Sequence, residues 1–210
     1  MGDKEGDAPL HVASAEGYAS YVKKVLEYSQ LEHQRPLEMR NRNLETLLFI
    51  ASYNAHIGVV KTLLKRGAET TLHVLNSHNI SPLWAASFNG SSEIVKELLY
   101  HGAGKTITTP GLGGETPLHA AATERHAEVL KLLLQVPDIS VNQKTTYGFT
   151  SLFIASRDGY HDIVELLLSA DSTEKNSLQN SSSPKEPIYN PGSVLAGICS
   201  GGLDAQTNRT

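Results

Sequence analysis

One short segment of this sequence has the residue types of a phosphate-binding loop. Residues 102–106 read Gly-Ala-Gly-Lys-Thr, like the end of a loop that binds nucleotide phosphates through its backbone N–H groups and lysine. Such a loop needs another glycine five residues before Gly104, where this chain has Leu99. It also needs a strand before it and a helix after it, whereas a helical pattern precedes it here and residues 107–110 (Ile-Thr-Thr-Pro) follow. The segment is therefore interpreted as a helix end that enters a connection.

The histidines and the cysteine are the other residues that could do chemistry. The chain has nine histidines and one cysteine. No pair of histidines forms a His-Glu-x-x-His motif, and no cysteine cluster accompanies them, so a zinc site is not predicted. Cys199 has no neighbouring base or helix N-terminus that would activate a thiolate. The sequence therefore predicts no catalytic residue, no cofactor and no metal.

Residues 115–135 give the clearest signal for secondary structure, a pair of short helices. Thr116 is a good helix N-cap, and Pro117 suits the first position of a helix because its missing N–H costs nothing there. Small alanines at 120–122 predict a short first helix, a break is expected near Arg125, and apolar residues at 129–134 predict a second helix. Two such short helices cannot bury their apolar sides alone, so they need neighbours of the same kind.

The same pattern occurs five times along the chain. Its shared leucine is spaced by 38, 35, 35 and 34 residues, at Leu10, Leu48, Leu83, Leu118 and Leu152. A period of about 33 residues with a Thr-Pro-Leu-His-x-Ala core is typical of ankyrin repeats. Over residues 6–170 the chain therefore resembles the ankyrin-repeat family. The resemblance implies an all-α fold, an ankyrin-repeat solenoid of stacked helix-turn-helix units that are joined by β-turn fingers.

The repeats also set the expected domain boundaries. After a lead-in at residues 1–5, repeats are expected at about 6–30, 44–68, 79–103, 114–138 and 148–170. Leu44 stands where the family has glycine, so the finger into repeat two is expected to be irregular. Residues 171–210 are expected to be a polar linker and tail. Within them, residues 193–203 are either a degenerate capping half-repeat or part of a disordered tail.

Composition limits the classes of partner and compartment. The net charge is −4 and the pI about 6.1, and no basic stripe is present, so neither nucleic acid nor an anionic membrane is an expected partner. Residues 1–5 are charged and no apolar stretch follows, so no signal peptide is expected. A single cysteine fits a reducing compartment. We expect a soluble intracellular protein, cytoplasmic or nuclear, that is monomeric when alone.

The resemblance to ankyrin repeats also implies where a partner would bind. In that family a concave face, made by the fingers and the ends of the first helices, contacts the partner. Transferred to this chain, the strongest candidates for partner binding are Arg42, Tyr53, His78, Phe88, Tyr147, Phe149 and Arg157. Tyr53 and Phe88 are the best pair, because consecutive repeats place them side by side and large aromatics suit an interface. Two alternatives stay open: Phe88 and Phe149 pack against the next repeat, and Arg157 forms a solvated edge with Asp158.

The predicted function is therefore binding, without catalysis. We expect a non-enzymatic protein–protein interaction module, an adaptor, scaffold or inhibitor, that binds another protein through the concave face. The alternative is a regulatory subunit or remnant of a larger system whose catalytic or DNA-binding part is another chain.

The histidines at the family's buried position, His11 and His119, are assigned a structural role.

Overall fold

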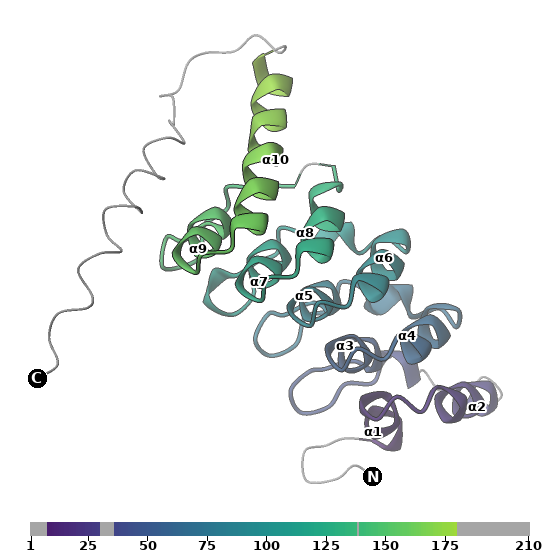
Figure 1. Cartoon of the computed structure of the whole chain (residues 1–210). Coiled ribbons are helices and arrows are strands. Elements are labelled where there is room, and N and C mark those ends of the chain that lie inside the picture. The colour runs from purple at the N-terminus through teal and green to yellow at the C-terminus, as the bar shows by residue number, and fades with distance from the viewer. Residues whose placement is uncertain (1–7, 30–35, 138, 180–210) are drawn as a thin grey trace, which may run out of the picture.

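The chain folds into a stack of five helix pairs. The computed structural model describes residues 8–29, 36–137 and 139–179 of the 210 in the sequence. This part contains ten α-helices and no strand (Figure 1). The helices are α1 (Pro9–Ala15), α2 (Ala19–Ser29), α3 (Leu47–Tyr53), α4 (Ile57–Leu64), α5 (Pro82–Phe88), α6 (Ser92–Tyr100), α7 (Pro117–Thr123), α8 (Ala127–Leu134), α9 (Ser151–Arg157) and α10 (His161–Gln179).

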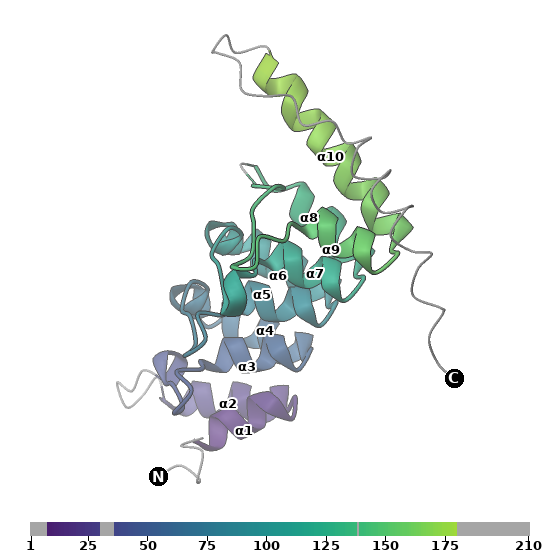
Figure 2. The same ribbon diagram turned by 90° about the vertical axis from the view of Figure 1, so that its left-hand side faces the viewer.

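The pairs are arranged in two layers. The first helices of the pairs, α1, α3, α5, α7 and α9, lie side by side in one row, and the second helices form a parallel row (Figures 1 and 2). Each helix contacts the corresponding helix of the next pair. Short 3-10 turns lie in the connections: η2 (Pro36–Glu38), η3 (Ala68–Thr71), η4 (Ala103–Thr106) and η5 (Leu112–Gly114). The predicted all-α ankyrin solenoid is confirmed.

The first helices begin where the sequence places a capping residue. The hydroxyl oxygen of Thr46 accepts the N–H of Phe49 at 3.2 Å, which satisfies one of the free donors of the first turn of α3. Ser81 caps α5 in the same way, and Thr150 caps α9. The repeated Thr or Ser before the leucine thus fixes where each of these helices starts.

The core runs through the whole stack rather than lying within single pairs. The repeated leucines Leu48, Leu83 and Leu118 are buried between neighbouring first helices, together with Val60 and Leu130 of the second layer. Burial of each such side chain stabilises the fold by about 1.5–3 kcal/mol. In repeat five, Leu152 and Val164 occupy the equivalent positions but are only half-buried. No later repeat within the described residues covers them.

The finger into repeat two is regular, contrary to the expectation from Leu44. Leu44 has φ of 59°, the left-handed conformation that Asn79, Gly114 and Gly148 adopt at the equivalent positions. The Asn41 side chain holds this turn, because its Oδ1 accepts the N–H groups of Asn43 and Glu45 at 3.0 Å. These hydrogen bonds offset the steric cost of a left-handed leucine. The prediction of an irregular finger was therefore wrong.

A tight left-handed turn separates the two helices of each pair, and two histidines join these turns to the preceding repeat. Nε2–H of His56 donates to the Ala15 carbonyl at 2.7 Å, and Nε2–H of His126 donates to the Phe88 carbonyl at 3.0 Å. Each imidazole ring lies against a glycine of the preceding turn, Gly90 in the case of His126. Both histidines are half-buried, and they connect consecutive repeats.

The C-terminal boundary also differs from expectation. Helix α10 does not end at Ala170 but continues to Gln179, and it projects beyond the end of α8 (Figures 1 and 2). The reason is visible in the sequence, because no glycine or proline occurs in residues 171–179 to end the helix. The half-repeat expected at residues 193–203 lies outside the described residues.

The contact between Gly90 and His126 can be tested by substitution. A Cβ added at Gly90 would collide with the His126 ring, so Gly90→Ala should displace the ring and break its hydrogen bond to Phe88. Gly159→Ala is the matched control, since Gly159 has the same φ of 73° and no described heavy atom within 4 Å of an added Cβ. Both variants should lose about 1–2 kcal/mol to the left-handed conformation. Gly90→Ala should lose about 1 kcal/mol more in urea unfolding. Equal losses would contradict the packing described.

Candidate protein-binding surface

Aromatic side chains are stacked on the outer side of the first helices and on the fingers. Phe49 stacks on Tyr53 with ring centroids 6.1 Å apart, and Trp84 stacks on Phe88 at 5.2 Å. In repeat five, the Phe149 ring stacks on Phe153 at 4.7 Å. We call the surface made by these stacks, the finger tips and the first-helix ends the finger face. It contains Arg42, Asn43, Glu45, Ser77, His78, Ile80, Leu112, Gly113, Glu115, Thr146, Tyr147 and Phe149 of the fingers, and residues 15–16, 53–54, 88–89, 123–124 and 157–158 of the helix ends.

The predicted aromatic residues differ in how far they are available to a partner. Tyr53 is 46% exposed, and Tyr147 at a finger tip is 77% exposed. Phe88 and Phe149 are half-buried, each against an aromatic ring of its own repeat. The stacks hold these rings in place and leave part of each in contact with solvent. The two tyrosines are therefore the most accessible aromatic candidates.

Sequence reasoning missed Phe153. Phe49, Trp84 and Phe153 occupy the position where the other repeats have His11 and His119, to which a structural role was assigned. Phe49 and Trp84 are indeed buried, but Phe153 is 41% exposed, because no described repeat follows repeat five. Its spacing of four residues from Phe149 was a usable signal, since Phe49–Tyr53 and Trp84–Phe88 have the same spacing and also stack.

Three of the predicted partner-binding residues are charged or polar: Arg42, His78 and Arg157. Arg42 and His78 are exposed on their finger tips, where the His78 N–H donates to Oδ1 of Asn76. Arg157 binds its neighbour Asp158 through two hydrogen bonds, of 2.7 and 2.9 Å. This pair matches the alternative of a solvated edge. An exposed pair of this kind contributes little to stability, about 0–1 kcal/mol.

The buried histidine of repeat four joins its helix to the next finger. Nδ1 of His119 accepts the hydroxyl of Thr116 at 2.8 Å, and its Nε2–H donates to the Phe149 carbonyl at 3.1 Å. Burial lowers the pKa of His119 below its usual value, and the hydrogen bonds to Phe149 and Gln143 only partly oppose this effect. The ring is therefore held neutral, as a structural link between repeats four and five.

One carboxylate of the finger face is in an unfavourable environment. Burial raises the pKa of Glu115 above its usual value, and the negative charge of Glu124 raises it further. The equivalent Glu45 of repeat two is stabilised, because the side-chain amide of Asn41 donates to its carboxylate at 2.8 Å. In repeat four the position of Asn41 is occupied by Gly111, which cannot supply such a donor.

The segment that resembles the end of a phosphate-binding loop has a different structure. Ala103–Thr106 is a 3-10 turn that follows the left-handed Gly102, and the Thr106 hydroxyl donates to the Ala103 carbonyl. This confirms the interpretation of residues 102–106 as a helix end. Among the residues that the structure describes, no group of three or more His, Cys, Asp or Glu side chains could hold a metal ion.

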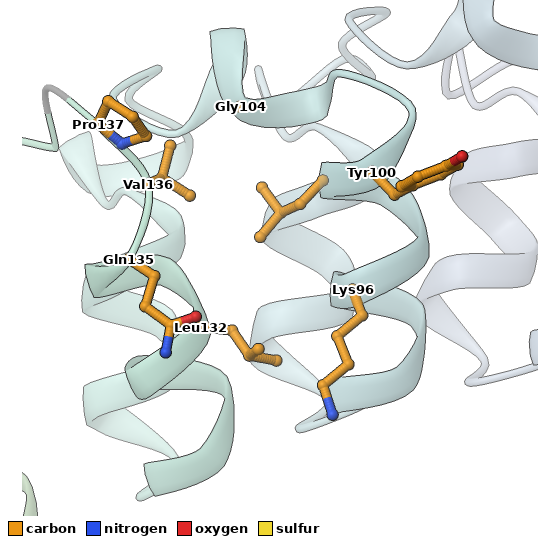
Figure 3. A pocket seen from close by; sticks show the side chains of 8 residues that line it. Lys96, Tyr100, Gly104, Leu132, Gln135, Val136 and Pro137 are labelled. Carbon is orange, nitrogen blue, oxygen red and sulfur yellow. The ribbon is translucent and has the colours of Figure 1, made fainter.

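A hollow of about 400 Å³ lies between α6 and α8, in the layer of second helices (Figure 3). Leu132 of α8 and Val136, which follows the end of α8, face α6 across it, while the Tyr100 ring points away from α8. The hollow is open and mainly apolar, and it is lined by Lys96, Leu99, Tyr100, Gly104, Leu132, Gln135, Val136 and Pro137. It lacks the paired acid and base that catalysis would need.

Comparison with known proteins agrees with the fold. A family model described as ankyrin repeats (3 copies) matches residues 76–179, which include α5 to α10. The chain belongs to the ankyrin-repeat family, whose members are generally protein–protein interaction modules and typically not enzymes. The structure shows two further helix pairs before the matched residues.

A curated protein also shares part of the sequence. Alpha-latrocrustotoxin-Lt1a of Latrodectus tredecimguttatus is 33% identical over 78 residues, which is 37% of this chain but only 5% of the toxin. The chain thus spans a small fraction of that protein. Within the described part of the chain, the helices are too short or too polar to span a bilayer.

The lowered pKa of His119 predicts a dependence of stability on pH. In the unfolded chain the imidazole binds a proton below about pH 6.5, whereas the folded chain resists protonation. The unfolded state therefore binds more protons, and the free energy of unfolding should fall as the pH decreases from 6.5 towards the lower folded-state pKa. The free energy of unfolding of His119→Gln should therefore fall less than that of wild type between pH 7.5 and 5.5, as measured by urea unfolding. Equal losses would show that His119 is not held neutral.

Proposed function

We propose that this chain is a non-enzymatic adaptor, scaffold or inhibitor that binds a partner protein through the finger face. The observation that carries this proposal is the row of aromatic stacks in repeats two, three and five, which ends in partly exposed rings at Tyr53, Tyr147 and Phe153. Large aromatic side chains are the commonest anchors of protein interfaces. They contribute most where their conformation is already fixed, because little side-chain entropy is then lost on binding.

The rigidity of the stack supports the same proposal. Two pairs of neighbouring fingers are joined by backbone hydrogen bonds. The N–H of Ser77 donates to the Asn43 carbonyl at 2.8 Å, and the N–H of Thr146 donates to the Gly113 carbonyl at 2.9 Å. Successive first helices are fixed by the shared leucine core. A partner would therefore meet a surface whose side chains are already in position.

A location inside the cell fits this role. The chain has a single cysteine, Cys199, and the fold depends on stacked leucines rather than on disulfides. Such a fold is stable in a reducing compartment. We therefore place the proposed interaction in the cytoplasm or nucleus.

Two double variants test whether the finger face binds. Tyr53→Ala/Tyr147→Ala removes the two exposed tyrosines of that face, and Tyr28→Ala/Tyr100→Ala removes two exposed tyrosines of the second helices as a matched control. Truncation of an interface anchor costs about 2 kcal/mol, or about a thirtyfold loss of affinity. Tagged full-length chains would be used to capture partners from native extract, with the bound proteins identified by mass.

A partner retained by wild type and by the control, and lost by the folded Tyr53→Ala/Tyr147→Ala variant, is the expected result. Thermal melting followed by circular dichroism checks that both variants remain folded. A partner lost only by the Tyr28→Ala/Tyr100→Ala control would place binding on the second helices and contradict the proposal.

A further inference from the structure

Two positions that the other repeats bury are more exposed in repeat five, where both residues are apolar. The repeated leucine is buried in repeats one to four, but Leu152 is only half-buried. The residue after it is also buried in those four repeats, whereas Phe153 is 41% exposed. Repeat one buries Leu10 and His11 although no described repeat precedes it, so both positions face the following repeat. Helix α9 ends the described row of first helices (Figure 1), and no described repeat covers its side with Leu152 and Phe153, which we call the open face.

Residues 193–203, which follow the described part of the chain, have the sequence pattern of a first helix. Repeats two to five have Thr or Ser two positions before the repeated leucine, and Ser or Ala four positions after it. Around Leu195, the same positions hold Ser193 and the similarly small Cys199. In all five repeats the residue seven positions after the leucine has a positive φ, and Gly202 stands at that position. Glycine adopts this conformation at the least cost, so the segment matches the register of the repeats at four positions.

The chain between α10 and this segment is long enough for the segment to reach the open face. Helix α10 ends at Gln179, about 14 Å along its axis beyond Ala170, where the second helix was expected to end. Residues 180–192 connect it to Ser193, and an extended chain of that length spans about 43 Å. The connection is also similar in length to residues 101–115, which join α6 to the capping residue of α7. The chain can therefore return along α10 to α9.

The composition of residues 193–203 suits an apolar face. They contain no charged side chain, and Leu195 and Ile198 supply apolar surface. Gly197 and Ile198 depart from the pattern, since the repeats have larger and smaller side chains at these two positions, respectively. The short tether favours docking within one chain, because it holds the segment at an effective concentration of about millimolar, above that of a second copy in dilute solution.

We propose that residues 193–203 dock on the open face of α9 of the same chain, as a further first helix that covers Leu152 and Phe153. Apolar surface removed from water on both sides offsets the entropy that is lost when the segment becomes ordered. The docked segment closes an end of the stack that otherwise exposes part of its core. The inference goes beyond the proposed function and does not rest on it. It leaves Tyr53 and Tyr147 as the exposed aromatic residues available to a partner.

Cys199 can report this docking, because it is the only cysteine of the chain. The serines at its position in repeats one to three are fully buried, so the docked segment should shield the thiol. Full-length wild type should react with a fluorogenic maleimide at least about tenfold more slowly than Leu195→Asp, because a buried charge opposes docking. Phe153→Asp should release the segment from the other side of the contact. Ile188→Asp is the matched control, since it makes a similar change in the connecting residues and should react like wild type.

Each rate is divided by the rate of the same variant in denaturant, which removes the effect of the new charge on the thiol itself. Thermal melting checks that the repeats of every variant stay folded. Equal relative rates in wild type and Leu195→Asp overturn the inference. Protection that Leu195→Asp loses but folded Phe153→Asp keeps places the segment elsewhere and also overturns it. Protection that disappears on dilution, together with a dimer in size-exclusion chromatography, assigns the open face to a second copy and contradicts docking within one chain.

Discussion

The structure depends on one constraint, which is that no helix pair buries its own leucines. Leu48, Leu83 and Leu118 are buried in helices that pack against a first helix on both sides. Each interface between pairs therefore stabilises two repeats at once, and the stability of the stack is close to a sum over such interfaces. Leu152 and Val164 of repeat five are only half-buried, because no later repeat among the described residues packs against them.

The same constraint positions the candidate binding surface. Because the first helices are held in register by their buried leucines, the residues one and five positions after each leucine lie in rows on the finger face. Phe49 and Tyr53 occupy these positions in repeat two, and Trp84 and Phe88 in repeat three. The leucine core therefore also determines where the aromatic stacks lie. In repeat four these two positions hold His119 and Thr123, so the row of aromatic rings does not continue there.

Sequence alone could predict the fold because its signals are local and repeated. A capping Thr or Ser, a leucine and a tight turn recur in phase. The hydroxyl groups of Thr46, Ser81 and Thr150 cap their helices as expected, whereas the Thr116 hydroxyl donates to His119 instead. The finger at Leu44 could not be predicted from its own residue type, since the Asn41 side chain three positions earlier supplies the hydrogen bonds that hold it. The end of α10 was misplaced because polar composition was taken to indicate a linker, although polar residues are compatible with a helix. The position of the candidate surface came from the family resemblance, and the environment of Glu115 could be described only once the fold was known.

The most direct test of the central claim is hydrogen–deuterium exchange of the full-length chain, free and bound to a captured partner. Amides at a binding surface exchange more slowly when that surface is covered. We expect slower exchange in the fingers and first-helix ends, at residues 41–54, 76–89, 111–124 and 145–158, with little change in α4, α6 and α8. Protection confined to α4, α6 and α8 would contradict binding through the finger face.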